Sequence, residues 1–132
     1  LLPPDALGRA RVRTLALSVA CDIHPLNNLR VLNYLTGTLG ATEAQRTDWM
    51  LHWMALGLAA IEAQLVSDAQ TGLCCHGDTP TLADCCLVPQ VFNARRFGLD
   101  LAPYPTVRRI AEHCEGLAPF QAAHPACQPD AE

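Results

Sequence analysis

The chain has 132 residues, a formal net charge of −4 at pH 7, and a composition that is 50% hydrophobic but only 5% aromatic. This length fits one domain, and a mild charge without a basic cluster makes nucleic acid and anionic membranes poor candidates as partners. No apolar run approaches the roughly 20 residues that a membrane span requires, and no signal peptide is visible at the start.

The first predicted helix begins near Asp5, a favourable N-cap residue, and continues through an apolar stripe from Val12 to Ile23. Pro25 then removes a backbone donor and crowds the preceding turn. We expect a kink at this proline and not necessarily an end, because leucines at helical spacing carry the pattern on until Gly37 and Gly40.

The second predicted helix follows after a short loop. Thr42 and Gln45 have the spacing of a capping box, in which each side chain binds the other residue's backbone N–H. The inner stripe of this helix runs from Met50 to Leu65, and Gly57 within the stripe lets another backbone approach closely. Two long helices joined in this way form a hairpin, which is the start of a helical bundle.

Three further helices are predicted after a loop over residues 67–80. Thr81 and Asp84 have N-cap and capping-box spacing, so we assign Asp84 to capping rather than catalysis. The helix that they begin is apolar almost all round, as expected of a buried central helix. A fourth helix is expected over about 106–114 and a short fifth over 117–123, with an irregular tail from Pro125. Since no strand periodicity is present, the predicted fold is all-α, a bundle of about five helices.

The seven cysteines include two adjacent pairs, at 74–75 and 85–86, and adjacent cysteines rarely bridge. We therefore expect reduced thiols in a cytoplasm-like compartment. Cys21 with His24, or Cys75 with His76, raises the alternative of a metal site, but no C-x-x-C pair accompanies them. Small buried cysteines are ordinary core residues, and we expect no metal.

Three stretches of the sequence resemble signatures of one family. GDTPTLADCCLVPQV (77–91) resembles the central-helix signature in the C-terminal domain of cytosolic glutathione transferases. CDIHPLNNLRVLNYL (21–35) and VPQVFNARRFGLDLAPYPTVRRI (88–110) narrow the resemblance to the zeta class, which contains maleylacetoacetate and maleylpyruvate isomerases. The resemblance covers essentially the whole chain, so we interpret residues 1–132 as one glutathione transferase C-terminal-like helical domain.

This resemblance implies a second domain and a reaction. Members of the family bind glutathione mostly through an N-terminal thioredoxin-like domain, and nothing in this chain looks like that domain. We therefore interpret the chain as part of a longer protein and expect it to be inactive by itself. The implied reaction is a cis–trans isomerisation of a dicarboxylic keto acid in aromatic-compound degradation, with glutathione as the cofactor. The family also implies a cytoplasmic homodimer.

The resemblance further implies that His24, Asn27 and Asn28 contact glutathione. These polar residues fall on one helix face, immediately after the kink expected at Pro25. The alternative interpretation is that Asn27 and Asn28 satisfy backbone carbonyls that the proline leaves without a donor, with His24 on the surface.

Arg30 and Arg96 are the implied contacts to substrate carboxylates, because the planar arginine fork binds a carboxylate bidentately. The alternative for Arg30 is a solvated position on an outer face. Arg95 is assigned to ordinary structure, since a cation at a helix C-terminus complements the helix dipole. Trp49 and Trp53 are interpreted as core or dimer-contact residues.

Two other functions stay open alongside the isomerase. One is a general glutathione-conjugating transferase, and the other is a non-catalytic interaction module of glutathione transferase type. Two carboxylate-binding arginines favour the isomerase, since a module needs neither. Maleylpyruvate and maleylacetoacetate are equal alternatives as substrate, because both present carboxylate termini and a central keto-enoate.

Overall fold

The computed structural model describes residues 1–129 and 131, which form an all-α bundle without a β-strand. A π-helical segment, Ser18–Ile23, joins α1 to α2, and a 3₁₀ turn, Pro125–Cys127, stands where the irregular tail was expected to begin. The all-α class is confirmed. The α-helices are α1 (Ala6–Leu17), α2 (His24–Leu26), α3 (Leu29–Gly37), α4 (Glu43–Ser67), α5 (Leu82–Arg96), α6 (Pro105–Glu115) and α7 (Ala118–Ala122).

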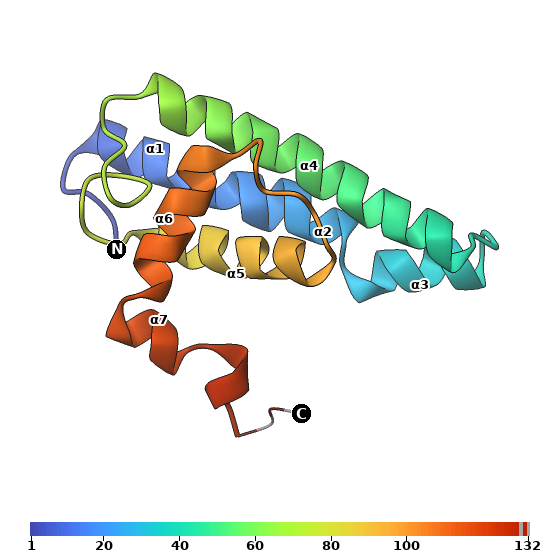
Figure 1. Cartoon of the computed structure of the whole chain (residues 1–132). Helices are drawn as coiled ribbons and strands as arrows, with labels where there is room; N and C mark the ends of the chain where they lie inside the picture. Colours follow the sequence, from blue (N-terminus) through green and yellow to red (C-terminus); the bar gives the residue numbers. More distant parts are fainter. Residues whose placement is uncertain (130, 132) are drawn as a thin grey trace.

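The core lies between α4, α5 and the rod that α1, the π-helical segment and α2 form together. Figure 1 shows α4 and α5 on opposite sides of this rod, and the π-helical segment contacts both of them. α6 packs on α4 and α5, while α7 and the 3₁₀ turn after it extend away from the bundle (Figure 1). Residues that are fully buried in this core include Val12, Met54, Leu58, Val91 and Ile110.

The first predicted helix begins as expected but does not continue to Gly37 as one kinked helix. The Asp5 carboxylate caps α1 by accepting from the Gly8 backbone N–H over 2.7 Å. Before Pro25, the helix widens into the π-helical segment, and α2 ends at Leu26. A new helix, α3, then starts because the Asn28 side chain serves as its N-cap. The predicted continuation of the helical pattern to Gly37 was therefore wrong, because Asn28 caps a new helix after α2 has ended.

α4 forms as predicted, with Thr42 and Gln45 in a capping box. The Thr42 backbone N–H donates to Gln45 Oε1 over 2.9 Å, and the Gln45 backbone N–H donates to Thr42 Oγ1 over 3.2 Å. A Cβ atom on Gly57 would lie only 2.2 Å from Cγ1 of Ile23. The close approach at Gly57 therefore involves a side chain, and not a second backbone as expected.

α4 also corrects the expectation that no segment is long and apolar enough to span a membrane. By length and composition alone it qualifies, with a mean hydropathy of 1.3 over an 18-residue window. One face of α4, however, is packed in the core through Met50, Met54, Leu58, Ile61 and Leu65. Apolar composition of this kind is also that of a core helix.

Two buried carboxylates hold helix N-termini in place. Asp84 accepts from both the backbone N–H and the hydroxyl of Thr81, over 2.7 and 2.8 Å, as its predicted capping role requires. Its other oxygen accepts from the Cys75 backbone N–H over 2.8 Å and so fixes the loop before α5. Glu62 of α4 accepts from the backbone N–H groups of Thr106 and Val107 in the first turn of α6. The contacts to Cys75 and to α6 were not predicted.

α5 is not buried all round among the described residues. Cys85, Pro89 and Arg96 are exposed, and Phe92 is half-buried. The almost continuous apolar sequence of α5 indicates burial but does not say which element covers each face. Here, one face of α5 borders a largely apolar pocket of about 560 Å³ whose other wall is the C-terminal segment, including Phe120 and Pro125.

Candidate functional site

The break between α2 and α3 presents three of the polar residues singled out in the sequence. His24 and Arg30 are exposed, and Asn28 is half-buried. The Asn28 Oδ1 atom accepts from the Arg30 backbone N–H over 3.1 Å, which begins α3. The Asn28 side-chain N–H₂ group has no acceptor among the described residues, and it therefore stays available as a donor.

Asn27 lies in the same break, but its side chain turns toward α4. Its Nδ2 atom donates to the Met50 carbonyl over 3.4 Å, and its Oδ1 atom is buried without a donor in the described part of the chain. The structure therefore separates Asn27 from His24 and Asn28 instead of placing all three on one face. Neither asparagine is bonded to a carbonyl that Pro25 frees, because Asn27 binds Met50 and Asn28 binds Arg30.

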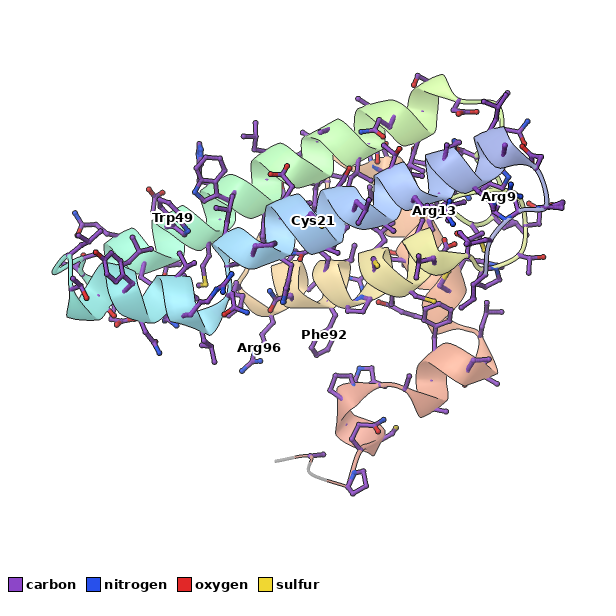
Figure 2. The ribbon with its side chains drawn as sticks, turned by 180° about the vertical axis from the view of Figure 1, so that it is seen from behind. Arg9, Arg13, Cys21, Trp49, Phe92 and Arg96 are labelled. Carbon is purple, nitrogen blue, oxygen red and sulfur yellow. The ribbon has the colours of Figure 1, made fainter. Side chains whose placement is uncertain are left out.

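The two arginines that end α5 have different surroundings. Arg95 forms an ion pair with Glu115 of α6, with 2.6 Å between Nη1 and Oε1. Arg96 forms no ion pair with any described residue, and its guanidinium lies 5.8 Å from the ring centre of Phe97. Figure 2 shows Arg96 and Phe92 pointing to the same side of α5, away from the bundle. Arg95 thus has a structural partner, whereas the positive charge of Arg96 is paired with no carboxylate in the part of the chain that the structure describes.

The C-terminal end of α5 lies beside the break between α2 and α3 in both views (Figure 1, Figure 2). α5 also contacts the π-helical segment, which directly precedes His24. Arg96, which ends α5, and Arg30, in the first turn of α3, are therefore exposed on neighbouring elements. His24, Asn28, Arg30 and Arg96 all offer hydrogen-bond donors here, which suit a ligand with several carboxylates.

The apolar pocket of about 560 Å³ continues along α5 from this group of donors. Phe92, one turn before Arg96, contacts the His124 ring edge-on, with 5.4 Å between the ring centres. This contact joins α5 to the C-terminal segment, so that the exposed face of α5 is apolar along the pocket and cationic at its end.

A buried cluster of two thiols and a carboxylate lies elsewhere, between the loop over residues 67–80 and α6. Ligand atoms of Cys74, Asp84 and Cys114 all lie within 4.8 Å of one another. Burial, and then the nearby Asp84 carboxylate, raises the pKa of Cys114 to about 12. The same two causes raise the pKa of Cys75. Because Asp84 already accepts hydrogen bonds from Thr81 and Cys75, we interpret this cluster of protonated thiols as part of the core.

The sequence analysis missed Glu62 as a structural residue, although a signal was present. Leu58, Ile61 and Leu65 mark the inner face of α4, and Glu62 follows that spacing one turn after Leu58. A carboxylate on a buried helix face requires partners, and helix N-termini are suitable ones.

Comparison with known proteins gives the same family from both sequence and structure. No family model matches the chain. A maleylpyruvate isomerase of Ralstonia sp is 55% identical over 130 residues, which are 98% of this chain and 61% of that protein. A probable maleylacetoacetate isomerase of Vibrio cholerae is 45% identical over 131 residues, or 99% of this chain and 60% of that protein.

Solved structures agree. The holo structure of a maleylpyruvate isomerase, described as a bacterial glutathione S-transferase of the zeta class, matches with a TM-score of 0.97 and 54% identity. The match covers 100% of this chain and 62% of that protein. A maleylpyruvate isomerase from Pseudomonas aeruginosa matches with a TM-score of 0.95 and 50% identity, with 100% of this chain and 69% of that protein covered. The chain belongs to the zeta class of glutathione transferases.

Membership in the zeta class confirms the resemblance seen in the sequence. The chain spans about three fifths of the length of the Ralstonia relative, whose matched share is 61%. A maleylacetoacetate isomerase from Anaeromyxobacter dehalogenans, solved with glutathione in its active site, matches this zeta-class chain with a TM-score of 0.92 and 54% identity. That match covers 100% of this chain and 59% of the other protein.

Proposed function

We propose that this chain is the substrate-side helical domain of a glutathione-dependent cis–trans isomerase that acts on maleylpyruvate or maleylacetoacetate. The observation that carries the proposal is Arg96, which forms no ion pair with the described residues and lies beside a break that presents the exposed Arg30 and the half-buried Asn28. The names of the relatives support the same reaction. A role in aromatic-compound degradation follows from those substrates.

The complete protein, in this proposal, carries a thioredoxin-like domain before the helical one. The support is the length of the relatives, since the matched region is 61% of the Ralstonia protein. The exposed apolar and cationic face of α5 suits contact with such a domain and with the ligands held between the two domains. This chain alone is then inactive, because the larger part of the glutathione site lies outside it.

The residues at the break fit glutathione, whose peptide carries two carboxylates and several backbone acceptors. The free N–H₂ group of Asn28 and the exposed imidazole of His24 are suitable donors to these acceptors. Bound glutathione supplies a thiol that adds reversibly to the substrate double bond, so that rotation about the resulting single bond and elimination give the trans product. Asn27 is not needed for this contact, since its amide faces α4.

Arg30 and Arg96 bind the two terminal carboxylates of the substrate. Each guanidinium offers a planar pair of donors that matches the geometry of a carboxylate. Arg96 has no competing carboxylate among the described residues, because the neighbouring Glu115 is already paired with Arg95. Holding the substrate by its carboxylates leaves its central carbon–carbon double bond accessible to the thiol.

We also propose that the complete protein is a cytoplasmic homodimer. Tyr34, Leu39 and Leu56, on and beside the hairpin of α3 and α4, expose 56%, 63% and 57% of their surface, and burying such side chains against a second copy would favour a dimer. Trp49 and Trp53, on the same α4 helix, are half-buried and contact each other edge-on. All seven cysteines are free, as reducing conditions require.

The test is a rate measurement with the complete protein. Maleylpyruvate and maleylacetoacetate are each supplied with and without glutathione, and an aromatic halide is supplied as a substrate for conjugation. We expect rapid formation of the trans isomer of at least one keto acid, only with glutathione, and without its consumption. Stoichiometric consumption of glutathione, with a conjugate as the product, would instead show a general transferase.

A further inference from the structure

Two hydrogen bonds attach α4 to the break between α2 and α3. The Trp49 indole N–H donates to the Leu26 carbonyl over 2.8 Å. The Asn27 side chain donates to the Met50 carbonyl over 3.4 Å. Two consecutive residues at the break, Leu26 and Asn27, thus bind two consecutive residues of α4, Trp49 and Met50. Each pair supplies one donor and one acceptor. We call this reciprocal arrangement the break clamp.

The break needs an external support of this kind. α2 has only three residues, and Leu26 is its last, so its carbonyl has no partner further along the same helix. The next residue, Asn27, leaves the helical conformation with φ −106° and ψ 9°. A segment with so few internal hydrogen bonds takes its orientation from what it is bound to.

The Trp49 side chain is a rigid donor for this purpose. Its ring is half-buried on α4 and packs edge-on against Trp53, with 5.5 Å between the ring centres. Only two side-chain torsions connect the indole to the long helix, and both are restricted by this packing. The position of the Leu26 carbonyl is therefore tied to α4.

Asn27 makes a weak contribution to stability but a specific one to geometry. Its Oδ1 atom is buried without a donor from the described residues, which costs stability. The carbonyl that it binds lies inside α4, where the helix already supplies a donor, so the fold does not require this hydrogen bond. An apolar side chain would serve packing better, whereas the amide fixes the direction in which the chain leaves α2.

We propose that Trp49 and Asn27 are positioning residues, which hold the break so that Asn28 and Arg30 meet glutathione and substrate in the correct orientation. Asn28 directly follows Asn27, and it both caps α3 and presents the free N–H₂ group. Neither clamp residue touches a ligand. The inference rests on the proposed function, and it gives Asn27 a role other than the glutathione contact expected from the sequence.

The first experiment compares Trp49→Phe with Trp53→Phe in the complete protein. Both changes replace an indole by a phenyl ring on the same helix, but only Trp49 donates a hydrogen bond to the break. We expect Trp49→Phe to raise KM for glutathione by about three- to tenfold, as loss of one hydrogen bond allows, with kcat within about twofold of wild type. An unchanged KM, or a change equal to that of Trp53→Phe, would overturn the proposal.

A double-mutant cycle tests whether Trp49 acts through Asn28. If it does, Trp49→Phe changes KM for glutathione much less in the Asn28→Ala background than in the wild type. Two independent, multiplicative effects would show that Trp49 acts elsewhere.

Hydrogen exchange separates this inference from the proposed function. Without any ligand, Trp49→Phe should speed amide exchange over residues 26–32 by about three- to tenfold, while Trp53→Phe leaves it unchanged. This result supports the clamp even if the wild-type protein neither binds glutathione nor isomerises a keto acid, in which case only the proposed function fails. Equal exchange in both variants would contradict the clamp itself.

Discussion

The buried carboxylate of Glu62 accepts the backbone N–H of Val107 over 2.8 Å, and in this way α4 holds the start of α6. A second bond, from the Thr106 N–H to the same carboxylate, is 2.9 Å long. The first backbone N–H groups of a helix have no partner within it, and the helix dipole favours an anion there. Glu62 therefore replaces the local cap that the sequence of α6 lacks.

Replacing this carboxylate should lower the stability of the fold. Glu62→Ala leaves the buried N–H of Val107 and the part-buried N–H of Thr106 without their acceptor, and we expect a loss of about 2 kcal/mol in the free energy of unfolding. Gln64→Ala is the control, because Gln64 is exposed on the same helix. Thermal denaturation measures the midpoint of each variant. Equal midpoints for Glu62→Ala and Gln64→Ala would show that Glu62 does not hold α6.

Gly57 should not accept a side chain while Ile23 is present. The added Cβ would lie 2.2 Å from Ile23 Cγ1, and we expect Gly57→Ala to cost about 1–3 kcal/mol through overpacking. In an Ile23→Ala background the same change should cost much less, since the new methyl group enters the space left by isoleucine. Chemical denaturation of the wild type, the two single variants and the double variant gives the coupling free energy between Gly57 and Ile23. Additive changes in the free energy of unfolding would contradict the predicted contact.

The buried thiols should resist modification and make the fold sensitive to alkaline pH. Burial and the Asp84 carboxylate raise the pKa of Cys114 from an ordinary 9.0 to about 12. The unfolded chain thus loses this proton at lower pH than the folded chain. The contribution of Cys114 to the free energy of unfolding is therefore complete below pH 9 and is lost as the pH rises toward about 12.

Alkylation followed by mass spectrometry checks this prediction. At pH 8, iodoacetamide should modify the exposed Cys127 promptly, and Cys75 and Cys114 only after unfolding. Rapid labelling of Cys114 in the folded protein would show that the cluster opens or that its thiols are ionised.

Local signals in the sequence predicted the parts of the fold that depend on near neighbours. The caps formed by Asp5, Thr42 and Asp84 were found because each binds a group within three residues along the chain. The end of α2 was missed because Asn28 was assigned to one face of a continuous helix, although asparagine favours an N-cap over a helix interior. The contact of Glu62 with α6 was missed because its partners lie 44 and 45 residues away.

The candidate site shows the same limit of sequence reasoning. The family resemblance, and not periodicity, indicated His24, Asn28, Arg30 and Arg96, and their contacts with ligands stay predictions. The structure adds which groups are already occupied, and the side chain of Asn27 is one of them. No local pattern predicts such a contact, because it depends on the packing of α4 against the break.

Arg95 and Arg96 provide a matched pair for testing the substrate contact in the complete protein. Arg96→Ala should lower kcat/KM by about 10- to 150-fold, the range expected for loss of one charge-assisted hydrogen bond. Arg96→Lys should recover only part of the loss, since lysine keeps the charge but not the bidentate fork. Arg30→Ala should resemble Arg96→Ala.

The most direct test of the account is therefore kcat/KM of Arg96→Ala measured beside that of Arg95→Ala, with glutathione saturating. Arg95 is paired with Glu115 over 2.6 Å, so Arg95→Ala should lower the thermal midpoint slightly and leave kcat/KM close to wild type. We expect the large loss in Arg96→Ala alone. A wild-type kcat/KM in Arg96→Ala, with the loss in Arg95→Ala instead, would contradict the assignment of Arg96 to the substrate.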